Sequence, residues 1–168
     1  MLITYDCSPL VPRGGFEFSG SWNGLFCFRA KSKKIINYNP SSNVNLKNIP
    51  DVWQLGYNSI FAFGYDEHND DYKAVYAYYA DYSDENMVLV YSLKYGTWKR
   101  RKRGFISGFV NPITVVFVSG NLNWCNNNLD DSDWNWNIIS YNLTTQTAKS
   151  IMLSIHEHGA AFFISGSR

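Results

Sequence analysis

Four acidic residues close together are the first candidates for chemistry in this sequence. They are Asp66, Glu67, Asp70 and Asp71. Calcium loops of the EF-hand kind need oxygen ligands at fixed offsets and a closing glutamate. The spacing from Asp66 to Asp70 does not meet that requirement, and no suitable glutamate follows. We therefore expect a solvated hairpin turn, in which Asp and Asn side chains hold the backbone.

A second acidic group lies beside two tryptophans. Asp130, Asp131 and Asp133 precede Trp134 and Trp136. A pair of carboxyl groups can hydrolyse a glycosidic bond, and tryptophan rings could stack on a sugar. Nothing in so polar a stretch would raise the pKa of a carboxyl group, as acid catalysis needs. The simpler interpretation is a loop between strands, in which the tryptophans could still bind a partner because exposed aromatics anchor interfaces.

The sharpest concentration of charge is the basic run 99–103, Lys-Arg-Arg-Lys-Arg. Such a run resembles a nuclear-import or nucleic-acid-binding patch. The whole chain has a net charge of only +1, and neither stacking aromatics at single-strand spacing nor a recognition helix accompanies the run. We expect an exposed turn, with Trp98 packed inward before it and Gly104 after it. We expect its positive charge either to bind an acidic target or to be neutralised by the acidic stretch 81–85.

The remaining candidates for catalysis or metal binding lack partners in the sequence. His156 and His158 share a strand face, but a zinc site needs three or four ligands. No serine or cysteine has a paired histidine. Cys7, Cys27 and Cys125 are odd in number and form no C-x-x-C pair, so we expect a reducing compartment. Cys27 and Cys125 have aromatic or apolar neighbours in sequence and are expected to be buried free thiols. The sequence therefore predicts no enzyme, no cofactor and no metal.

The elements that must carry these residues are predicted to be strands. Of 168 residues, 17% are aromatic, 45% are apolar and 17% are charged. Aromatic residues favour pleated, half-buried surfaces, and apolar residues nowhere recur at helical spacing with an N-cap and a stop. The composition excludes a disordered chain, and no apolar run reaches the roughly 20 residues of a membrane-spanning helix. We predict an all-β fold.

One pattern, an apolar strand followed by a tyrosine and a polar turn, occurs three times. The tyrosines are Tyr38, Tyr91 and Tyr141, at spacings of 53 and 50 residues. A kelch-type propeller blade repeats at about 50 residues, and a closed ring has roughly four to eight blades. The chain therefore predicts about three blades of antiparallel strands, an incomplete ring, within a single domain over 1–168.

Two glycine-containing stretches are predicted to be hairpin turns. Gly120-Asn121 lies between apolar runs, and glycine tolerates the positive φ that tight turns need. The stretch 20–24, Gly-Ser-Trp-Asn-Gly, is predicted to be a longer version of the same turn. The stretch 159–166 resembles the first strand of another blade, so we expect a fragment of a larger protein. Residues 1–15 are either native or a tag, since 10–14 matches a thrombin site.

Six motifs in order resemble those of plant F-box-associated domains, and within that family S-locus F-box proteins are the most similar. The motifs lie at 20–27, 38–42, 61–75, 90–98, 118–124 and 139–143. The stretch 61–75 is very similar to the family's G-Y-D-x-x-x-D-D-Y-K-V-V pattern. Trp22 stands where the G-S-C-N-G-L-L-C motif often has cysteine, and Asn123 replaces the histidine of V-N-G-x-x-H-W. The resemblance covers most of the chain.

The resemblance implies the substrate receptor of an SCF-type E3 ubiquitin ligase. In that family a kelch-like domain holds the target protein for ubiquitination, and a helical F-box docks on a Skp-type adaptor. No helical F-box segment stands upstream of Leu2, so we expect target binding here and adaptor binding only through an F-box absent from this chain. No nucleic acid or membrane partner is expected. The expected location is the cytoplasm, or alternatively the nucleus.

Target binding is expected on loops that join strands at one rim, because loops on a rigid scaffold carry function. The candidates are aromatic residues in polar, turn-like surroundings, namely Trp53, Tyr57, Tyr82, Trp134 and Trp136. One alternative is a carbohydrate-binding β protein, which depends on the tryptophans and aspartates of 130–136. Another is a truncated product with no ligase function.

Overall fold

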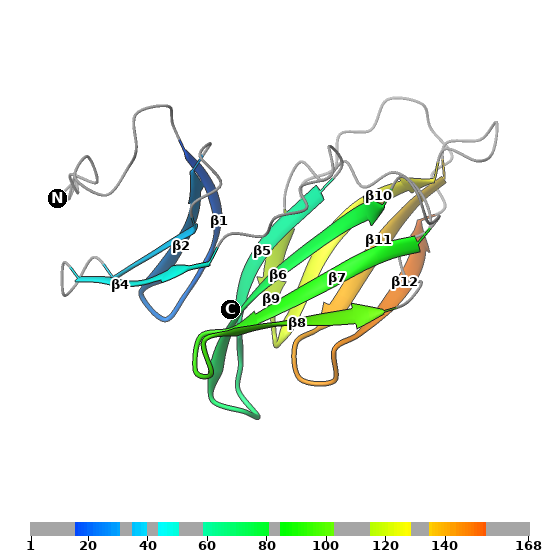
Figure 1. Ribbon diagram of the computed structural model, residues 1–168. Helices are drawn as coiled ribbons and strands as arrows, with labels where there is room; N and C mark the ends of the chain where they lie inside the picture. The colour runs from blue at the N-terminus through cyan, green and yellow to red at the C-terminus, as the bar shows by residue number, and fades with distance from the viewer. Residues whose placement is uncertain are drawn as a thin grey trace, which may run out of the picture. The chain divides into compact units, whose positions relative to one another are not determined.

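The described part of the chain is built from β-strands. The computed structural model describes residues 16–30, 35–39, 44–50, 59–80, 85–102, 115–128 and 135–153 (Figure 1). These residues form twelve strands in three four-stranded antiparallel sheets. Among the same residues there is no helix of the length and apolarity needed to cross a membrane. The all-β prediction is confirmed.

The chain comprises two compact units, Met1–Gln54 and Leu55–Arg168, each described by itself. The first unit contains one sheet, in which every strand pairs with the next along the chain. Its strands are β1 (Phe16–Trp22), β2 (Leu25–Ala30), β3 (Ile35–Asn39) and β4 (Val44–Ile49). Apolar side chains including Leu25, Cys27 and Ile49 are buried in this unit. The single domain predicted over 1–168 stays a prediction.

The second unit contains two sheets with the same sequential strand order. One sheet consists of β5 (Ser59–Asp66), β6 (Asp71–Ala80), β7 (Glu85–Ser92) and β8 (Thr97–Lys102). The other consists of β9 (Val115–Val118), β10 (Asn121–Asn128), β11 (Asn135–Asn142) and β12 (Thr147–Leu153). Four antiparallel strands joined in sequence are what one propeller blade requires. The three predicted repeats therefore correspond to the three sheets.

The repeated tyrosines occupy equivalent places in the three sheets. Tyr38, Tyr91 and Tyr141 lie in β3, β7 and β11, the third strand of each sheet. Tyr91 and Tyr141 are buried. In the two sheets of the second unit, the third strand ends at a tight turn directly after this pattern, at 93–96 and at 143–146.

The two sheets of the second unit share a hydrophobic core. Its buried members come from the facing sides of both sheets and include Ile60, Val75, Val90, Leu122, Trp124, Ile139 and Leu143. The two sheets approach closely at Gly64, because a Cβ atom there would lie 2.4 Å from Phe117 Cδ2 and 2.9 Å from Leu143 Cδ1. Glycine at this position lets β5 lie directly against the neighbouring sheet.

Both predicted glycine turns need correction. The first is a two-residue turn of Asn23 and Gly24, with φ of 48° and 75°, so residues 20–22 belong to β1. The second turn consists of Ser119 and Gly120, with φ of 45° and 77°, and Asn121 begins β10. A two-residue hairpin of this kind needs positive φ at both central residues, which shifts the second turn back by one residue and shortens the first.

Candidate functional site

The sheets of the second unit have two ends, which we call the hairpin rim and the loop rim. The hairpin rim carries the tight turns at 67–70, 93–96, 119–120 and 143–146. These turns lie together at the lower end of both sheets in Figure 1. The loop rim is the opposite end, where β6 ends and β7 begins in one sheet, and where β10 ends and β11 begins in the other.

Asp66 is the centre of a polar network that joins the two sheets at the hairpin rim. It is the last residue of β5 and is fully buried. Lys73 Nζ forms an ion pair with its carboxylate and also donates to the carbonyl of Leu143 at 2.9 Å. Thr144 Oγ1 donates to Asp66 Oδ1 at 2.6 Å, and Asn69 Nδ2 donates to Oδ2 at 2.7 Å. Both sheets therefore contribute donors to this network.

Thr144 is itself held in place by the turn between β11 and β12. Its backbone N–H donates to Asn142 Oδ1 at 3.0 Å, and the N–H of Thr145 donates to the same oxygen at 2.8 Å. An asparagine side chain that caps its own following turn is a local property of the sequence. The turn thus presents the Thr144 hydroxyl to Asp66 in a fixed position.

The network keeps the Asp66 carboxyl group charged although it is buried. Burial alone would raise its pKa, but the hydrogen bonds from Lys73, Thr144 and Asn69 outweigh burial and hold the pKa well below its usual range. A buried carboxylate needs such compensation, because removing one partner of a buried ion pair costs roughly 3–5 kcal/mol. Loss of one partner would therefore leave the buried Asp66 carboxylate incompletely compensated at the contact between the sheets.

Asp71, the first residue of β6, organises the neighbouring turn in the same way. It is buried, Ser92 Oγ donates to its Oδ2 at 2.6 Å, and the backbone N–H of Lys94 donates to its Oδ1 at 2.9 Å. The N–H of Tyr95 donates in turn to Ser92 Oγ at 3.1 Å. Lys94 Nζ reaches back to the carbonyl of Asn69 at 3.0 Å. The turns at 67–70 and 93–96 are therefore tied together.

The prediction for the acidic stretch is confirmed in one respect and wrong in another. An Asp side chain does hold the turn, since the backbone N–H of Asn69 donates to Asp66 Oδ1 at 3.3 Å. Asp66 and Asp71 are buried rather than solvated, however, because Lys73 and Ser92 supply partners for their oxygens. Within the described ranges, no three His, Cys, Asp or Glu residues are grouped so that they could hold a metal ion.

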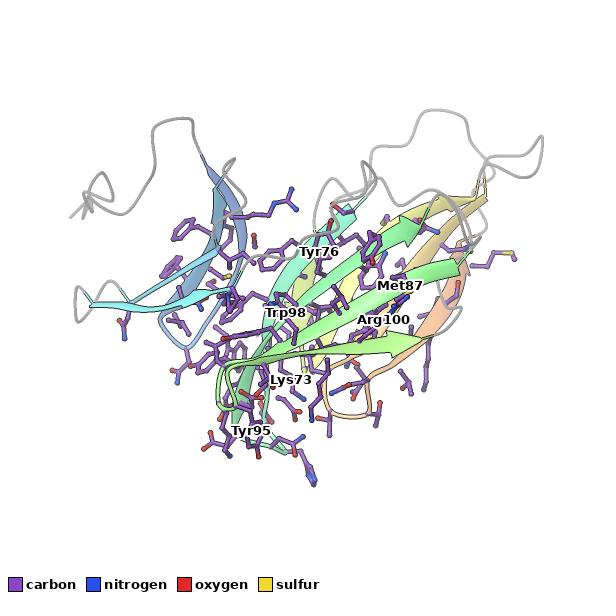
Figure 2. All side chains as sticks on the ribbon, in the orientation of Figure 1. Lys73, Tyr76, Met87, Tyr95, Trp98 and Arg100 are labelled. Carbon is purple, nitrogen blue, oxygen red and sulfur yellow. The ribbon has the colours of Figure 1, made fainter. Side chains whose placement is uncertain are left out.

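The hydrogen bonds of Asp66 and Asp71 hold the turns of the hairpin rim, and these turns carry polar and aromatic side chains. Tyr95 is 68% exposed at the tip of the β7–β8 turn (Figure 2). Tyr65 donates a hydrogen bond to Asp70, which raises the pKa of the phenol to about 12, and its ring packs on Tyr72 at a centroid distance of 4.9 Å. Sequence reasoning missed Tyr95, although the following Gly96, with φ of 67°, is a turn signal.

Most of the predicted binding residues lie outside the described residues. These are Trp53, Tyr57, Tyr82 and Trp134. Trp136 lies in β11, where its backbone is opposite Asn127 and Leu153.

Within the second unit, strands that adjoin Tyr57, Tyr82, Trp134 and Trp136 in sequence have ends at the loop rim. Ser59, where β5 begins, pairs with Tyr78 near the end of β6, so both ends belong to the loop rim. The strand β11, which carries Trp136, also begins there. The role of the five aromatic residues in binding stays a prediction.

The described part of the basic run, 99–102, forms part of a strand and not the turn that the sequence predicted. Residues 99–102 lie in β8, whose register with β7 continues from Ser92 opposite Thr97 to Met87 opposite Lys102. Trp98 is half-buried, with its ring 5.1 Å from that of Tyr91, so the strand is anchored at its start. Cross-strand pairing of this kind overrides the low intrinsic strand preference of lysine.

The free thiols are confirmed for two cysteines. Cys27 is buried and Cys125 is half-buried, so complete burial holds for Cys27 only. Burial raises the pKa of both thiols, which makes them poor nucleophiles. His68 is exposed in the turn at 67–70, while Cys7, His156 and His158 lie outside the described residues.

Comparison with known proteins decides the family. The protein-family model of the F-box associated beta propeller domain matches residues 4–161 of the sequence. The chain belongs to this family. An F-box/kelch-repeat protein of Arabidopsis thaliana is 28% identical over 153 residues, which cover 84% of this chain and 40% of that protein. The chain thus spans about two fifths of the relative's length. An F-box-associated propeller domain is a binding module, typical of the substrate-recognition part of F-box proteins.

Proposed function

We propose that this F-box-associated domain recognises a target protein for an SCF-type E3 ubiquitin ligase. The observation that carries the proposal is the family match over 4–161, together with three sheets built as propeller blades. In this proposal the domain holds the target protein, and an F-box segment holds the Skp-type adaptor. Other subunits supply the ubiquitin-transfer chemistry, so the domain itself needs no catalytic residue.

The structure of the second unit supports a rigid scaffold for such binding. The shared core and the Asp66 network fix the two sheets against each other. Loops and turns on a rigid scaffold can hold a partner without a large ordering cost. We propose the loop rim, where β11 begins, as the principal contact surface, and Trp134 and Trp136 as candidate contact residues. The cytoplasm is the proposed location, and imaging of the tagged protein tests this against the nucleus.

Capture of the target from plant cells tests the proposed function. The tagged protein is expressed together with a variant in which Trp134 and Trp136 are both alanine, and bound proteins are compared after proteasome inhibition. We expect a protein that is retained by the unmodified chain, lost by the variant and ubiquitinated in a manner that depends on the chain. Equal capture by both forms would refute a role of the two tryptophans in target binding. Binding to a glycan array with no protein retained would refute the proposal in favour of carbohydrate binding.

A further inference from the structure

Strand β8 is the outer edge of its sheet and carries an unusual charge. Among the described residues it pairs with β7 and with no other strand. Its sequence is Thr-Trp-Lys-Arg-Arg-Lys, so four of its six residues are basic. An edge strand presents backbone N–H and C=O groups with which another extended chain can pair. The edge of β8 can therefore pair with another extended chain, and it carries positively charged side chains.

The equivalent strands of the other two sheets show that this charge exceeds what edge protection needs. Lysine on an edge strand discourages pairing between copies of a protein. Strand β4 carries one basic residue, Lys47, and β12 also carries one, Lys149. Since β8 holds the same place in its sheet and has four, protection of the edge does not account for the other three.

The described cations of β8 lie on both faces of the strand. Lys99 and Arg100 are exposed, and successive residues of a strand point to opposite faces. Lys99 is opposite Val90, a member of the shared core, while Arg100 is opposite Leu89. A guanidinium N–H of Arg100 contacts Met87 Sδ at 3.2 Å, which holds the side chain over β7 (Figure 2). A strand added to this edge would meet positive charge above and below it.

We propose that the edge of β8 binds an extended acidic segment of the target protein as a fifth strand of the sheet. Backbone hydrogen bonds along the edge would supply affinity, and carboxylates beside Lys99 and Arg100 would supply selectivity. The inference rests on the proposed function in taking the partner to be a target protein. A nucleic acid fits less well, because its backbone has no amide groups to pair with the strand and a net charge of +1 gives little long-range attraction.

Binding of a labelled peptide to the full 168-residue chain tests the proposal. The probe is an eight-residue peptide of Val and Thr with Glu and Asp at adjacent central positions, followed by fluorescence anisotropy. We expect Lys99→Glu and Arg100→Glu each to weaken binding about tenfold, which is the effect of losing one favourable charge contact. The matched control Lys149→Glu changes an exposed lysine on β12 and is expected to leave binding within about twofold. Equal effects at positions 99 and 149 would overturn the proposal.

Two further probes separate strand addition from simple charge attraction. One peptide is N-methylated at its odd positions and the other at its even positions, so each lacks the amide donors of one edge. We expect one of the two to lose binding, because a strand pairs through one edge. If both bind as the parent peptide does, strand addition is refuted. Tighter binding of an oligothymidylate than of the peptide would refute the choice of partner.

The outcome also separates this inference from the proposed function. In plant cells, a Lys99→Glu variant that still captures the target would refute the role of β8 and leave the recognition module intact. If the unmodified protein captures no target yet binds the acidic peptide, the proposed function fails while the edge site stands.

Discussion

Replacement of Lys73 by methionine tests whether the Asp66 network joins the two sheets of the second unit. The substitution keeps the length of the side chain but removes the charge that neutralises Asp66, and it leaves the carbonyl of Leu143 without its Nζ donor. Removing one partner of a buried ion pair costs roughly 3–5 kcal/mol. Because Asp66 lies at a rim, where water can reach a vacated site, we expect the lower end, about 3 kcal/mol. For a domain of this size that corresponds to a fall in Tm of roughly 6–12 °C.

Chemical and thermal unfolding, followed by tryptophan fluorescence, measure the effect. Trp124 is buried in the core that the two sheets share, so its emission reports their separation. The matched control is Lys149→Met, which changes an exposed lysine and is expected to alter the free energy of unfolding by less than about 0.5 kcal/mol. A loss at Lys73 no larger than that of the control would refute the claim that the network stabilises the contact between the sheets.

Three further predictions follow from the same part of the chain. Since the pKa of Asp66 is lowered in the folded state, its stabilisation is complete above the unfolded pKa of about 3.9 and is lost as pH falls below that value; acid titration should show a steeper loss of stability in the unmodified chain than in Lys73→Met. Gly64→Ala should cost about 1–3 kcal/mol in urea unfolding, because its Cβ would overlap Phe117 and Leu143. In Gly120→Ala the added Cβ would meet no atom within 4 Å, but the backbone would keep a φ of 77°. We therefore expect a loss of about 1–2 kcal/mol in the free energy of unfolding from backbone strain alone. Gly120→Asn should recover part of that loss, and equal costs for Ala and Asn would contradict the strain argument.

The fold could be predicted from the sequence because its signals are local. Each third strand combines an apolar run with a tyrosine, and the three copies recur at nearly equal spacing. The turn at 119–120 was misplaced by one residue, because nothing in the sequence shows that Ser119 adopts a positive φ of 45°. Local patterns therefore predicted the strands better than the residues that end them.

The Asp66 network could not be predicted, because it depends on contacts with Leu143 and Thr144, which are distant in sequence. Asp66 stands among acidic and polar residues, which predicts exposure, and its burial depends on Lys73 and on Thr144, which lies 78 residues away. The strand β8 was missed for a similar reason. Its basic residues favour an exposed turn when taken alone, and only the pairing with β7 makes them a strand. Tertiary contacts decided both cases.

The buried ion pair has a further consequence for where the exposed turns lie. The core between the sheets is apolar, and the free energy of burying apolar surface has no preferred direction. The bonds from Lys73 to Leu143 and from Thr144 to Asp66 have fixed lengths and directions, so they allow one alignment of the turns at 67–70 and 143–146. We infer that the network sets this alignment. A double variant, Asp66→Leu with Lys73→Leu, should recover stability relative to Lys73→Met but broaden the amide NMR signals of both turns, and sharp signals at unchanged positions would refute the inference.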